Sequence, residues 1–369
     1  MDRRSFLKTS AIGGGAAAAS TLAAPAVAQG RMSWRMVTTW PRNFPGLGTG
    51  AQRLADRITK ASDGMLTVEL FSAGEIVPAL QSIDAVIDGS AEMMHGAAYY
   101  WQNKSVGLSF FTGVPFGMTS REMSAWVRFL GGQELWDEVY DQFGLIGFMS
   151  GDTGTQSGGW FQNELQGIED VQGLRFRTPG LGGQVWEKMG ASVTNLAGGE
   201  IFAALQSGAL DAAEFVGPYN DLALGFHQVR NHFYTTSFIE PGLATEFVVD
   251  KAKYMDLPEN LQAIIRDACQ AEYDHTASEF YANDPIALRT LVEEHGVQTY
   301  PQFPDSILEA GANASRELLI EILDTADPIS KRVAESFIQS LNLLRERTEN
   351  QDVGFLEARD RFFDISDLA

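Results

Sequence analysis

The sequence predicts an α/β protein of two lobes, joined by hinge strands and followed by long C-terminal helices. Residues 174–216 alternate between strand-like and helical spacing as β-α-β-α-β, the pattern of a parallel sheet. The string at 75–82 matches 200–207 at six of eight positions, which suggests a second copy of this unit. Beyond residue 258, apolar residues recur mostly at helical spacing. Two such lobes imply a ligand cleft between them and closure about a hinge.

The N-terminus has the pattern of an export signal. Arg3 and Arg4 open a twin-arginine motif, small apolar residues follow over 11–24, and residues 26–28 read Ala-Val-Ala, a typical cleavage site. The apolar run is too short and too interrupted for a permanent membrane anchor. We therefore expect residues 1–28 to be a twin-arginine signal peptide and the mature protein to be soluble and periplasmic.

Composition narrows the classes of function. The formal net charge is −21, and the leader carries more basic than acidic residues, so its removal makes the charge more negative. Such a charge argues against nucleic acid as a partner. The single cysteine, Cys269, lies in a helical pattern and is expected to be a buried structural thiol.

The first lobe is expected from residues 29–152 together with about 240–300. Its expected strands are 34–40, 66–71, 91–96, 145–150, 246–251 and 296–300. Its expected helices are 51–60, 75–82 and 120–143. The last of these is amphipathic, with core candidates Trp126, Phe129, Leu130, Leu135, Trp136 and Val139. Tyr99 and Tyr100, at the end of a strand, either fill core or wall a pocket.

The second lobe is expected from residues 153–239 together with about 301–325. Its expected strands are 158–162, 174–179, 191–196 and 211–216. Its expected helices are 185–189 and 198–210. Residues 152–156 form a Gly-containing crossover that we interpret as hinge plus binding loop, in which Gln156 offers a neutral oxygen or is an ordinary loop amide.

The C-terminal part is expected to be helical. The expected helices are 258–291, with a break at Asp284-Pro285, and 306–323 and 328–347. The last of these carries an apolar stripe that must be buried against something. In the simplest interpretation, residues 326–369 form C-terminal helices that pack on their own second lobe.

The predicted parallel sheet also indicates where a ligand binds. Ligands of such sheets lie at the carboxyl ends of the strands, which is where Arg177, Glu214 and Phe215 fall. One cation and one anion at neighbouring strand ends suggest a small polar ligand. For Arg177 the alternative is a salt bridge to a carboxylate of its own lobe.

Motifs of catalysis are absent from the sequence. It contains no G-x-S-x-G, H-E-x-x-H or C-x-x-C, and its five histidines do not fall at metal-ligand spacing. Carboxylate pairs assembled by folding leave no such trace, so an exported enzyme stays an alternative, although we expect no enzyme.

Four segments resemble the substrate-binding proteins of tripartite ATP-independent periplasmic (TRAP) transporters. They are the leader, His-Gly-Ala-Ala-Tyr-Tyr-Trp at 95–101, the run from Phe-Arg-Thr-Pro-Gly at 176–191, and Ala-Leu-Gln-Ser-Gly-Ala-Leu-Asp-Ala-Ala-Glu-Phe at 204–215. The resemblance covers the mature chain and implies the two-lobed periplasmic-binding-protein fold. Gln156, Glu214 and Glu240 resemble the branch that binds 2-oxo or 2-hydroxy monocarboxylates, such as pyruvate or lactate, with a metal cation.

The resemblance implies a role for each site residue. Arg177 would grip the substrate carboxylate, and Gln156, Glu214 and the carbonyl of Phe215 would hold sodium or calcium, with Glu240 beside them. For hydrogen bonds to the substrate we expect Tyr100 first, then Tyr99, and more weakly Asn220. Phe215 departs from the tryptophan expected there, which puts the preferred length of the substrate side chain in doubt.

The resemblance also implies partners. These are the membrane subunits of a TRAP transporter and a second copy of the chain, through a C-terminal helix exchanged in a homodimer. A C4-dicarboxylate binder of the same fold is the other alternative; it would need a second cationic group where this chain has Glu214 and Glu240.

Overall fold

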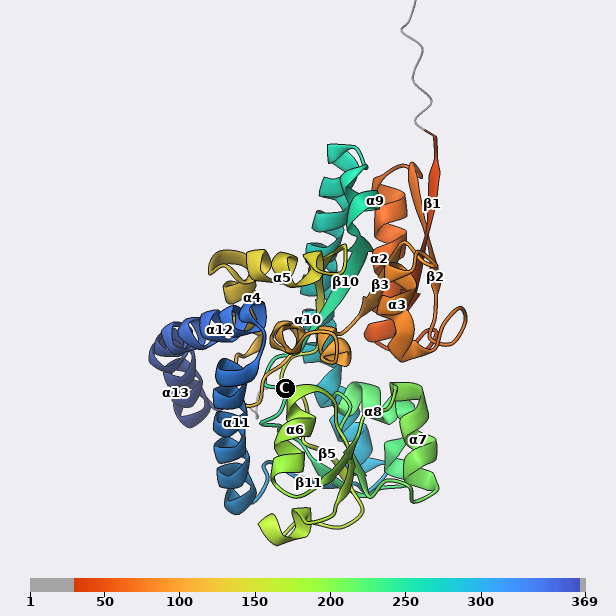
Figure 1. Cartoon of the computed structure of the whole chain (residues 1–369). Helices are drawn as coiled ribbons and strands as arrows, with labels where there is room; N and C mark the ends of the chain where they lie inside the picture. Colours follow the sequence, from red (N-terminus) through yellow and green to blue (C-terminus); the bar gives the residue numbers. More distant parts are fainter. Residues whose placement is uncertain (1–29, 366–369) are drawn as a thin grey trace, which may run out of the picture.

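The computed structural model describes residues 30–365 and has two lobes, one above the other in Figure 1, each built on one β-sheet. The predicted signal peptide lies outside the described residues. The first sheet has the order β2-β1-β3-β10-β4 and the second β11-β9-β5-β8-β6-β7. The strands of the first sheet are β1 (Met32–Thr38), β2 (Leu66–Phe71), β3 (Met93–Gly96), β4 (Leu145–Asp152) and β10 (Ala244–Asp250). Those of the second are β5 (Gly159–Phe161), β6 (Arg175–Arg177), β7 (Ser192–Thr194), β8 (Ala212–Ala213), β9 (His232–Tyr234) and β11 (Gln298–Tyr300).

Both sheets have the same local plan, which confirms the predicted pair of α/β lobes. In the first, β1 pairs in parallel with β2 and β3, and the antiparallel β10 joins β3 to β4. In the second, β6 pairs in parallel with β7 and β8, and the antiparallel β5 joins β8 to β9. β11 pairs with β9, so residues 298–300 belong to the second sheet although we expected residues up to about 300 in the first lobe.

Helices cover both sheets and extend beyond them. Those of the first lobe are α2 (Leu47–Ala61), α3 (Ser82–Ile87), α4 (Ser120–Phe129), α5 (Gly132–Asp141) and α9 (Lys251–Met255). Those of the second are α6 (Gly180–Lys188), α7 (Gly198–Gln206) and α8 (Pro218–Leu224). The long helices are α10 (Glu259–Glu293), α11 (Asp305–Thr325) and α12 (Pro328–Arg347), followed by a π-helical turn, η6 (Thr348–Val353), and α13 (Gly354–Phe362). No helix within residues 30–365 has both the length and the apolar character needed to span a membrane.

The repeated string lies on equivalent connections, between β2 and β3 in the first sheet and between β7 and β8 in the second, but the helix expected over 75–82 was wrong. Residues 200–207 lie in α7 and at its end, whereas residues 75–82 form a turn and a short 3-10 helix, η1 (Ala79–Gln81), before α3 begins. Pro78 stands where the second copy has Ala203, and a proline inside a helix removes a backbone hydrogen bond. The lobes repeat in topology, and the two copies of the string lie on equivalent connections with different local structure.

Two helix predictions also needed correction. Residues 120–143 form two helices, because Gly131 adopts a left-handed conformation (φ 86°) between α4 and α5. Phe129, at the end of α4, is 84% exposed instead of buried, and Leu130 is only partly buried. The predicted break at Asp284-Pro285 does not occur: Pro285 lies inside the continuous α10. That helix packs on β4 and α2 in the first lobe and on α8 in the second, and this packing outweighs the hydrogen bond that the proline removes.

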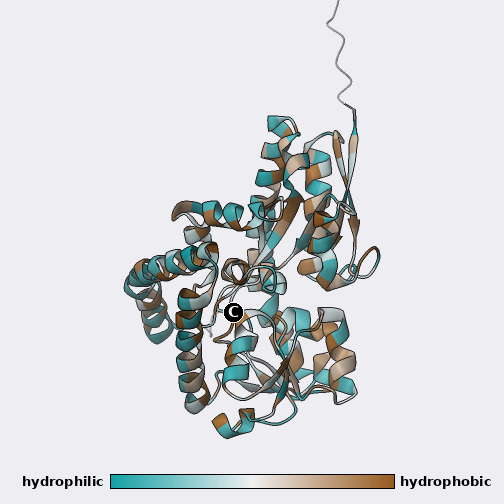
Figure 2. Ribbon diagram, in the orientation of Figure 1, coloured by the Kyte–Doolittle hydropathy of each residue, from teal (hydrophilic) through white to brown (hydrophobic). Residues whose placement is uncertain are grey.

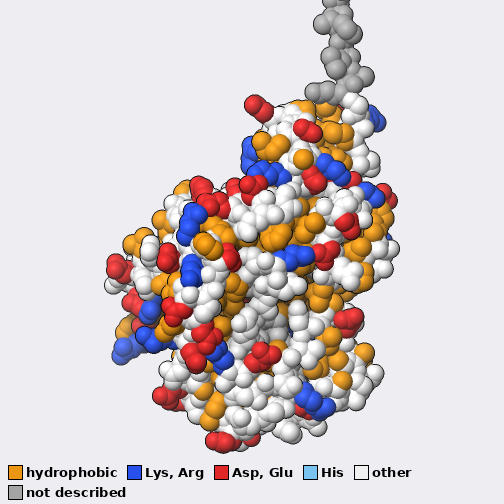
Figure 3. All heavy atoms as spheres, viewed as in Figure 1, with side chains coloured by type: hydrophobic (Ala, Val, Ile, Leu, Met, Phe, Trp, Pro, Cys, Tyr) orange, Lys and Arg blue, Asp and Glu red, His pale blue; other side chains and the backbone are white. Residues whose placement is uncertain are grey.

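Aromatic side chains fill the core of each lobe. Phe111 stacks between Trp126 and Trp136 in the first, and Trp160 stacks on Phe233 in the second. Cys269 is buried with a free thiol, as predicted. Figure 2 shows apolar and polar residues mixed along α12 and α13, and Figure 3 shows acidic side chains scattered over both lobes on the face in view.

Two chain segments cross side by side between the lobes. One leads from β4 to β5 and the other from β9 to β10. Backbone hydrogen bonds join them: Thr153 N–H donates to the Leu243 carbonyl (3.1 Å), Gln156 N–H to that of Glu240 (3.0 Å), and Ser237 N–H to that of Gln156 (3.0 Å). Gln156 and Glu240 are therefore held together in the hinge itself.

Candidate functional site

Oxygen atoms from three segments converge where the crossing segments meet the second sheet. The Gln156 side chain donates from Nε2 to Thr153 Oγ1 (3.0 Å), which turns its Oε1 toward three other oxygens. These are Glu214 Oε1 and Glu240 Oε2, each at 2.7 Å, and the carbonyl oxygen of Phe215 at 2.9 Å. Glu214 and Phe215 directly follow β8, as the strand-end prediction required.

Four oxygens this close repel one another unless something positive lies among them. A half-turn of the Gln156 amide would bring its NH2 within hydrogen-bond distance of the other three oxygens, but its two hydrogens can satisfy only two of them fully. A cation could instead be coordinated by all four oxygens, because amide, carboxylate and carbonyl oxygens are the ligands that hard cations prefer. Within residues 30–365, no group of three or more His, Cys, Asp or Glu side chains is placed to hold a metal. The cluster described here contains only two such side chains, and its other two donors are an amide oxygen and a backbone carbonyl.

The two carboxylates of this cluster are poorly accommodated as anions. Glu214 is 1% exposed and Glu240 2% exposed. Burial raises the pKa of Glu214 to about 7, although the positive charge of Arg177 opposes the shift. Burial and the neighbouring Glu214 raise the pKa of Glu240 well above its ordinary value. A bound cation would relieve this cost.

Arg177, the last residue of β6, lies beside the oxygen cluster and is fully buried. Its Nη1 donates to the Glu214 carbonyl (2.6 Å) and its Nε to the Leu196 carbonyl (3.0 Å). The salt bridge that was the alternative role is long, with 3.8 Å between Nη1 and Glu214 Oε2. Nη2 has no hydrogen-bond partner among the described residues. A buried guanidinium with an unused donor is suited to an anionic ligand.

Tyr99 and Tyr100 approach this site from the first lobe. They lie in a 3-10 turn, η2 (Ala98–Trp101), that follows β3, and are 4% and 8% exposed. Burial raises the pKa of both phenols, and the charge of Arg177 opposes the shift. The Tyr99 ring packs on Gly180 at the start of α6, where a Cβ would lie only 2.4 Å from the ring. The two lobes therefore meet in direct contact at the site.

Asn220 is fully buried in α8 and links the lobes differently from our expectation. Its Nδ2 donates to the Pro45 carbonyl (2.8 Å) in the first lobe, and its Oδ1 has no partner among residues 30–365. No hydrogen bond between described residues joins it to Arg177 or Gln156, so its role toward a substrate stays a prediction.

The structure adds site residues that the sequence analysis missed. Thr153 orients the Gln156 amide, and Thr178 Oγ1 donates weakly to Glu214 Oε2 (3.4 Å). Thr178 directly follows Arg177, and Thr153 lies three residues before Gln156 in the predicted binding loop, and this proximity was the available signal. Phe44, from the loop after β1, packs its ring against Phe215 with centroids 5.9 Å apart, a contact between lobes that no sequence pattern indicates.

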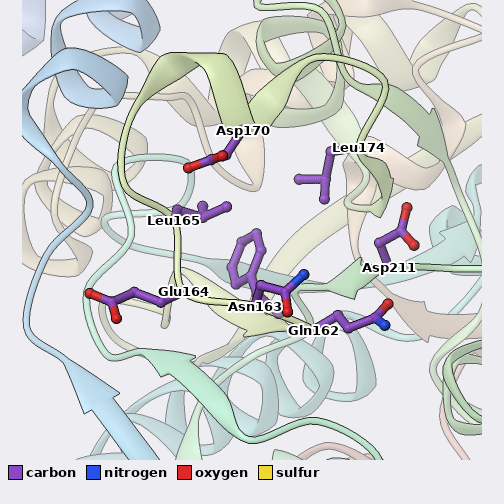
Figure 4. A pocket seen from close by; sticks show the side chains of 8 residues that line it. Gln162, Asn163, Glu164, Leu165, Asp170, Leu174 and Asp211 are labelled. Atoms are coloured by element: carbon purple, nitrogen blue, oxygen red, sulfur yellow. The ribbon is translucent and has the colours of Figure 1, made fainter.

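A second hollow, of about 160 Å³, lies away from this site (Figure 4). Its lining includes Leu174, just before β6, whereas Arg177 ends that strand, so it opens at the opposite edge of the sheet. Its carboxylates, Glu164, Asp170 and Asp211, come from separate segments and lie apart in Figure 4. It does not resemble a cation site.

Two lobes that meet over a buried arginine and an oxygen cluster define a solute-binding protein. The chain belongs to the family of bacterial extracellular solute-binding proteins, family 7, whose model matches residues 36–324. This is a family of solute-binding proteins, not of enzymes.

Individual relatives agree with this assignment. The monocarboxylate 2-oxoacid-binding periplasmic protein of Nostoc sp. (strain PCC 7120) is 39% identical over 331 residues, covering 87% of this chain and 89% of that protein. A TRAP periplasmic solute-binding protein from Pseudoalteromonas atlantica T6c, crystallised with sodium and pyruvate, matches with a TM-score of 0.86 at 37% identity, covering 89% of this chain and 99% of that one. A TRAP solute-binding protein from Bordetella bronchiseptica RB50, a mixed-occupancy dimer with copurified calcium and picolinate, matches with a TM-score of 0.87 at 29% identity, covering 89% and 97%.

Proposed function

We propose that the protein captures a small 2-oxo or 2-hydroxy monocarboxylate together with sodium or calcium and delivers it to the membrane subunits of a TRAP transporter. The observation that carries the proposal is the convergence of four oxygens beside the unpartnered Nη2 of Arg177. Gln156, Glu214, Glu240 and the Phe215 carbonyl would hold the cation. A 2-oxo acid would chelate this cation through one carboxylate oxygen and its 2-oxygen.

The remaining residues divide the work between the lobes. Arg177 binds the carboxylate by charge-assisted hydrogen bonds from the second lobe. Tyr100 and Tyr99 donate from the first lobe, and Asn220 joins the two lobes through its hydrogen bond to the Pro45 carbonyl. A ligand that contacts both lobes binds the closed form better than the open one, so closure reports occupancy to the membrane subunits.

The relatives support a chelated ligand. Pyruvate carries a 2-oxo group beside its carboxylate, and picolinate carries a ring nitrogen there, so each offers two donors to one cation. A C4-dicarboxylate would instead bring its second negative charge toward the buried Glu214 and Glu240. We also propose export by the twin-arginine pathway, on the pattern of the leader.

Thermal unfolding of the mature protein against a panel of acids tests the function. Pyruvate and lactate should raise the melting temperature when sodium or calcium is present and much less when both are removed. A ligand at 100 times its Kd adds about 2.7 kcal/mol to the free energy of unfolding. Stabilisation by succinate or malate alone, indifferent to metal, would contradict the proposal.

A homodimer is the second part of the proposal. Residues 349–365, which include α13, are exposed throughout, and they carry Phe355, Phe362 and Phe363 at 64%, 74% and 66% exposure. Exposed aromatic residues in such a cluster are typical of an interface, and the Bordetella relative is a dimer. Light scattering should give twice the monomer mass, and the double substitution Phe355→Asp with Phe362→Asp should give the monomer, while Glu349→Gln should have no effect. A monomeric wild-type protein would contradict the dimer.

A further inference from the structure

His95 is a buried ionisable residue to which the proposed function gives no role. It lies in β3, in the middle of the first sheet, and is 2% exposed. Its Nδ1 lies 2.9 Å from Nε1 of Trp40. An indole N–H can only donate, so His95 Nδ1 accepts and the neutral ring carries its hydrogen on Nε2. Burial lowers the pKa of His95 to about 3, so this acceptor is present at any pH near neutral.

Trp40 connects His95 to the proposed site. It follows the end of β1 by two residues and is buried. Its carbonyl accepts from Ala73 N–H (3.0 Å), and the N–H of the preceding Thr39 donates to the His95 carbonyl (3.2 Å). A side chain on a fixed backbone can still turn about its own bonds. The hydrogen bond to His95 therefore sets the plane of the indole ring.

Tyr100 packs against this indole. The two ring centroids lie 6.3 Å apart, and the rings of Tyr99 and Trp101 flank Tyr100 at 4.7 Å and 6.2 Å. Burial raises the pKa of the Tyr100 phenol, and the charge of Arg177 opposes the rise, so the phenol faces the arginine of the second lobe. Tyr99 and Trp101 belong to the same short turn as Tyr100, η2. Trp40 thus ties the Tyr100 ring to the body of the first sheet.

We propose that His95 is a positioning residue: it holds the Trp40 indole in place and through it orients the Tyr100 phenol for the substrate. This inference rests on the function proposed above, in which Tyr100 donates to the bound acid. All three side chains belong to the first lobe, so their contacts can persist when the lobes open. A donor that is already oriented loses less freedom when the ligand binds, and binding is stronger for it.

Trp40→Phe tests the inference, because it keeps an aromatic ring beside Tyr100 and removes the donor to His95. Pyruvate is titrated calorimetrically with calcium present. Its affinity should fall by about three- to tenfold, the worth of one hydrogen bond. Trp126→Phe is the matched control, because Trp126 is also buried in the first lobe and donates from Nε1 to Ser336 Oγ (3.1 Å), but lies in α4 away from the site. Its pyruvate affinity should be that of wild type.

Substitutions of His95 separate positioning from a purely structural role. His95→Leu removes the acceptor and should weaken pyruvate binding as much as Trp40→Phe does. His95→Asn offers an oxygen near the place of Nδ1 and should restore most of the affinity. In a Tyr100→Phe background both losses should vanish, because the phenol that His95 and Trp40 orient is then absent. A general loss of stability would instead weaken binding in both backgrounds.

The outcomes separate this inference from the proposed function. Wild-type affinity in both Trp40→Phe and His95→Leu would overturn the inference, as would equal losses with and without the Tyr100 phenol, an equal loss in Trp126→Phe, or a His95→Asn variant that binds no better than His95→Leu. If Tyr100→Phe binds pyruvate as tightly as wild type, the inference fails and the cation site beside Arg177 stands. No binding of pyruvate by the folded wild type would overturn the proposed function and the inference together.

Discussion

Substituting Arg177 by lysine is expected to lower affinity for pyruvate by about 10²- to 10³-fold and to leave the protein folded. Lysine keeps the positive charge beside Glu214, so no buried carboxylate loses its neighbouring cation. It lacks the fixed fork of donors, however, and cannot at once donate to the carbonyls of Glu214 and Leu196 and grip a carboxylate. Calorimetric titration with pyruvate in the presence of calcium measures the loss.

Arg175→Lys is the matched control, because it lies two residues earlier in the same strand. Its guanidinium is half exposed and pairs with Asp211 at the surface, so pyruvate affinity should be unchanged. Circular dichroism and the melting temperature establish that both variants fold. If Arg177→Lys binds pyruvate as tightly as wild type, Arg177 is only the structural partner of Glu214, and the ligand site lies elsewhere.

The sequence could predict the site where its residues follow from strand order. Arg177, Glu214 and Phe215 end neighbouring parallel strands, and a parallel sheet brings strand ends together whatever the loops do. Gln156 and Glu240 lie on crossing segments whose pairing is set by backbone hydrogen bonds between residues far apart in the sequence. Only the family resemblance placed these two residues beside the others.

The errors have local physical causes. The string at 75–82 matches at six of eight positions, but one of the two differences is Pro78, which is incompatible with the interior of a helix. Pro285 had the opposite effect: the expected break is overridden because α10 is packed along both lobes. The apolar spacing predicted one helix continuing past Phe129, but α4 ends at Phe129 and the left-handed Gly131 precedes a new helix. Local sequence propensity determines the backbone conformation where tertiary packing is weak, and it is overridden where tertiary packing is extensive.

The cation dependence of pyruvate binding is expected to depend on Glu240. Wild type should bind pyruvate about 10²-fold more weakly once sodium and calcium are removed. The cation and the carboxylate attract each other, so the binding of each strengthens the binding of the other. In Glu240→Gln the cation loses one anionic ligand, so we expect this ratio to fall to about tenfold or less. Titrations in calcium buffer and in chelator with choline as the only added cation give the ratio.

The same substitution should stabilise the protein when no cation is present. Glu240 and Glu214 each lie 2.7 Å from the same Gln156 atom, and burial raises the pKa of both, so removing one acid removes a cost of folding. Urea unfolding in chelator should show the gain. A gain in stability in chelator together with a smaller cation dependence of pyruvate binding identifies Glu240 as a cation ligand. A residue that only supports the fold would not show both effects.

Glu246→Gln is the control for a buried acid away from the site. Glu246 lies in β10, its Oε2 accepts from Tyr140 Oη–H (2.6 Å), and burial raises its pKa to about 8. Neutralising it should leave the calcium dependence of pyruvate binding at the wild-type ratio, because no ligand of the cation is lost. If Glu240→Gln also keeps that ratio, Glu240 is not a cation ligand. If Glu240→Gln is less stable than wild type in chelator, burying Glu240 beside Glu214 does not destabilise the fold, and the cation has no such cost to relieve.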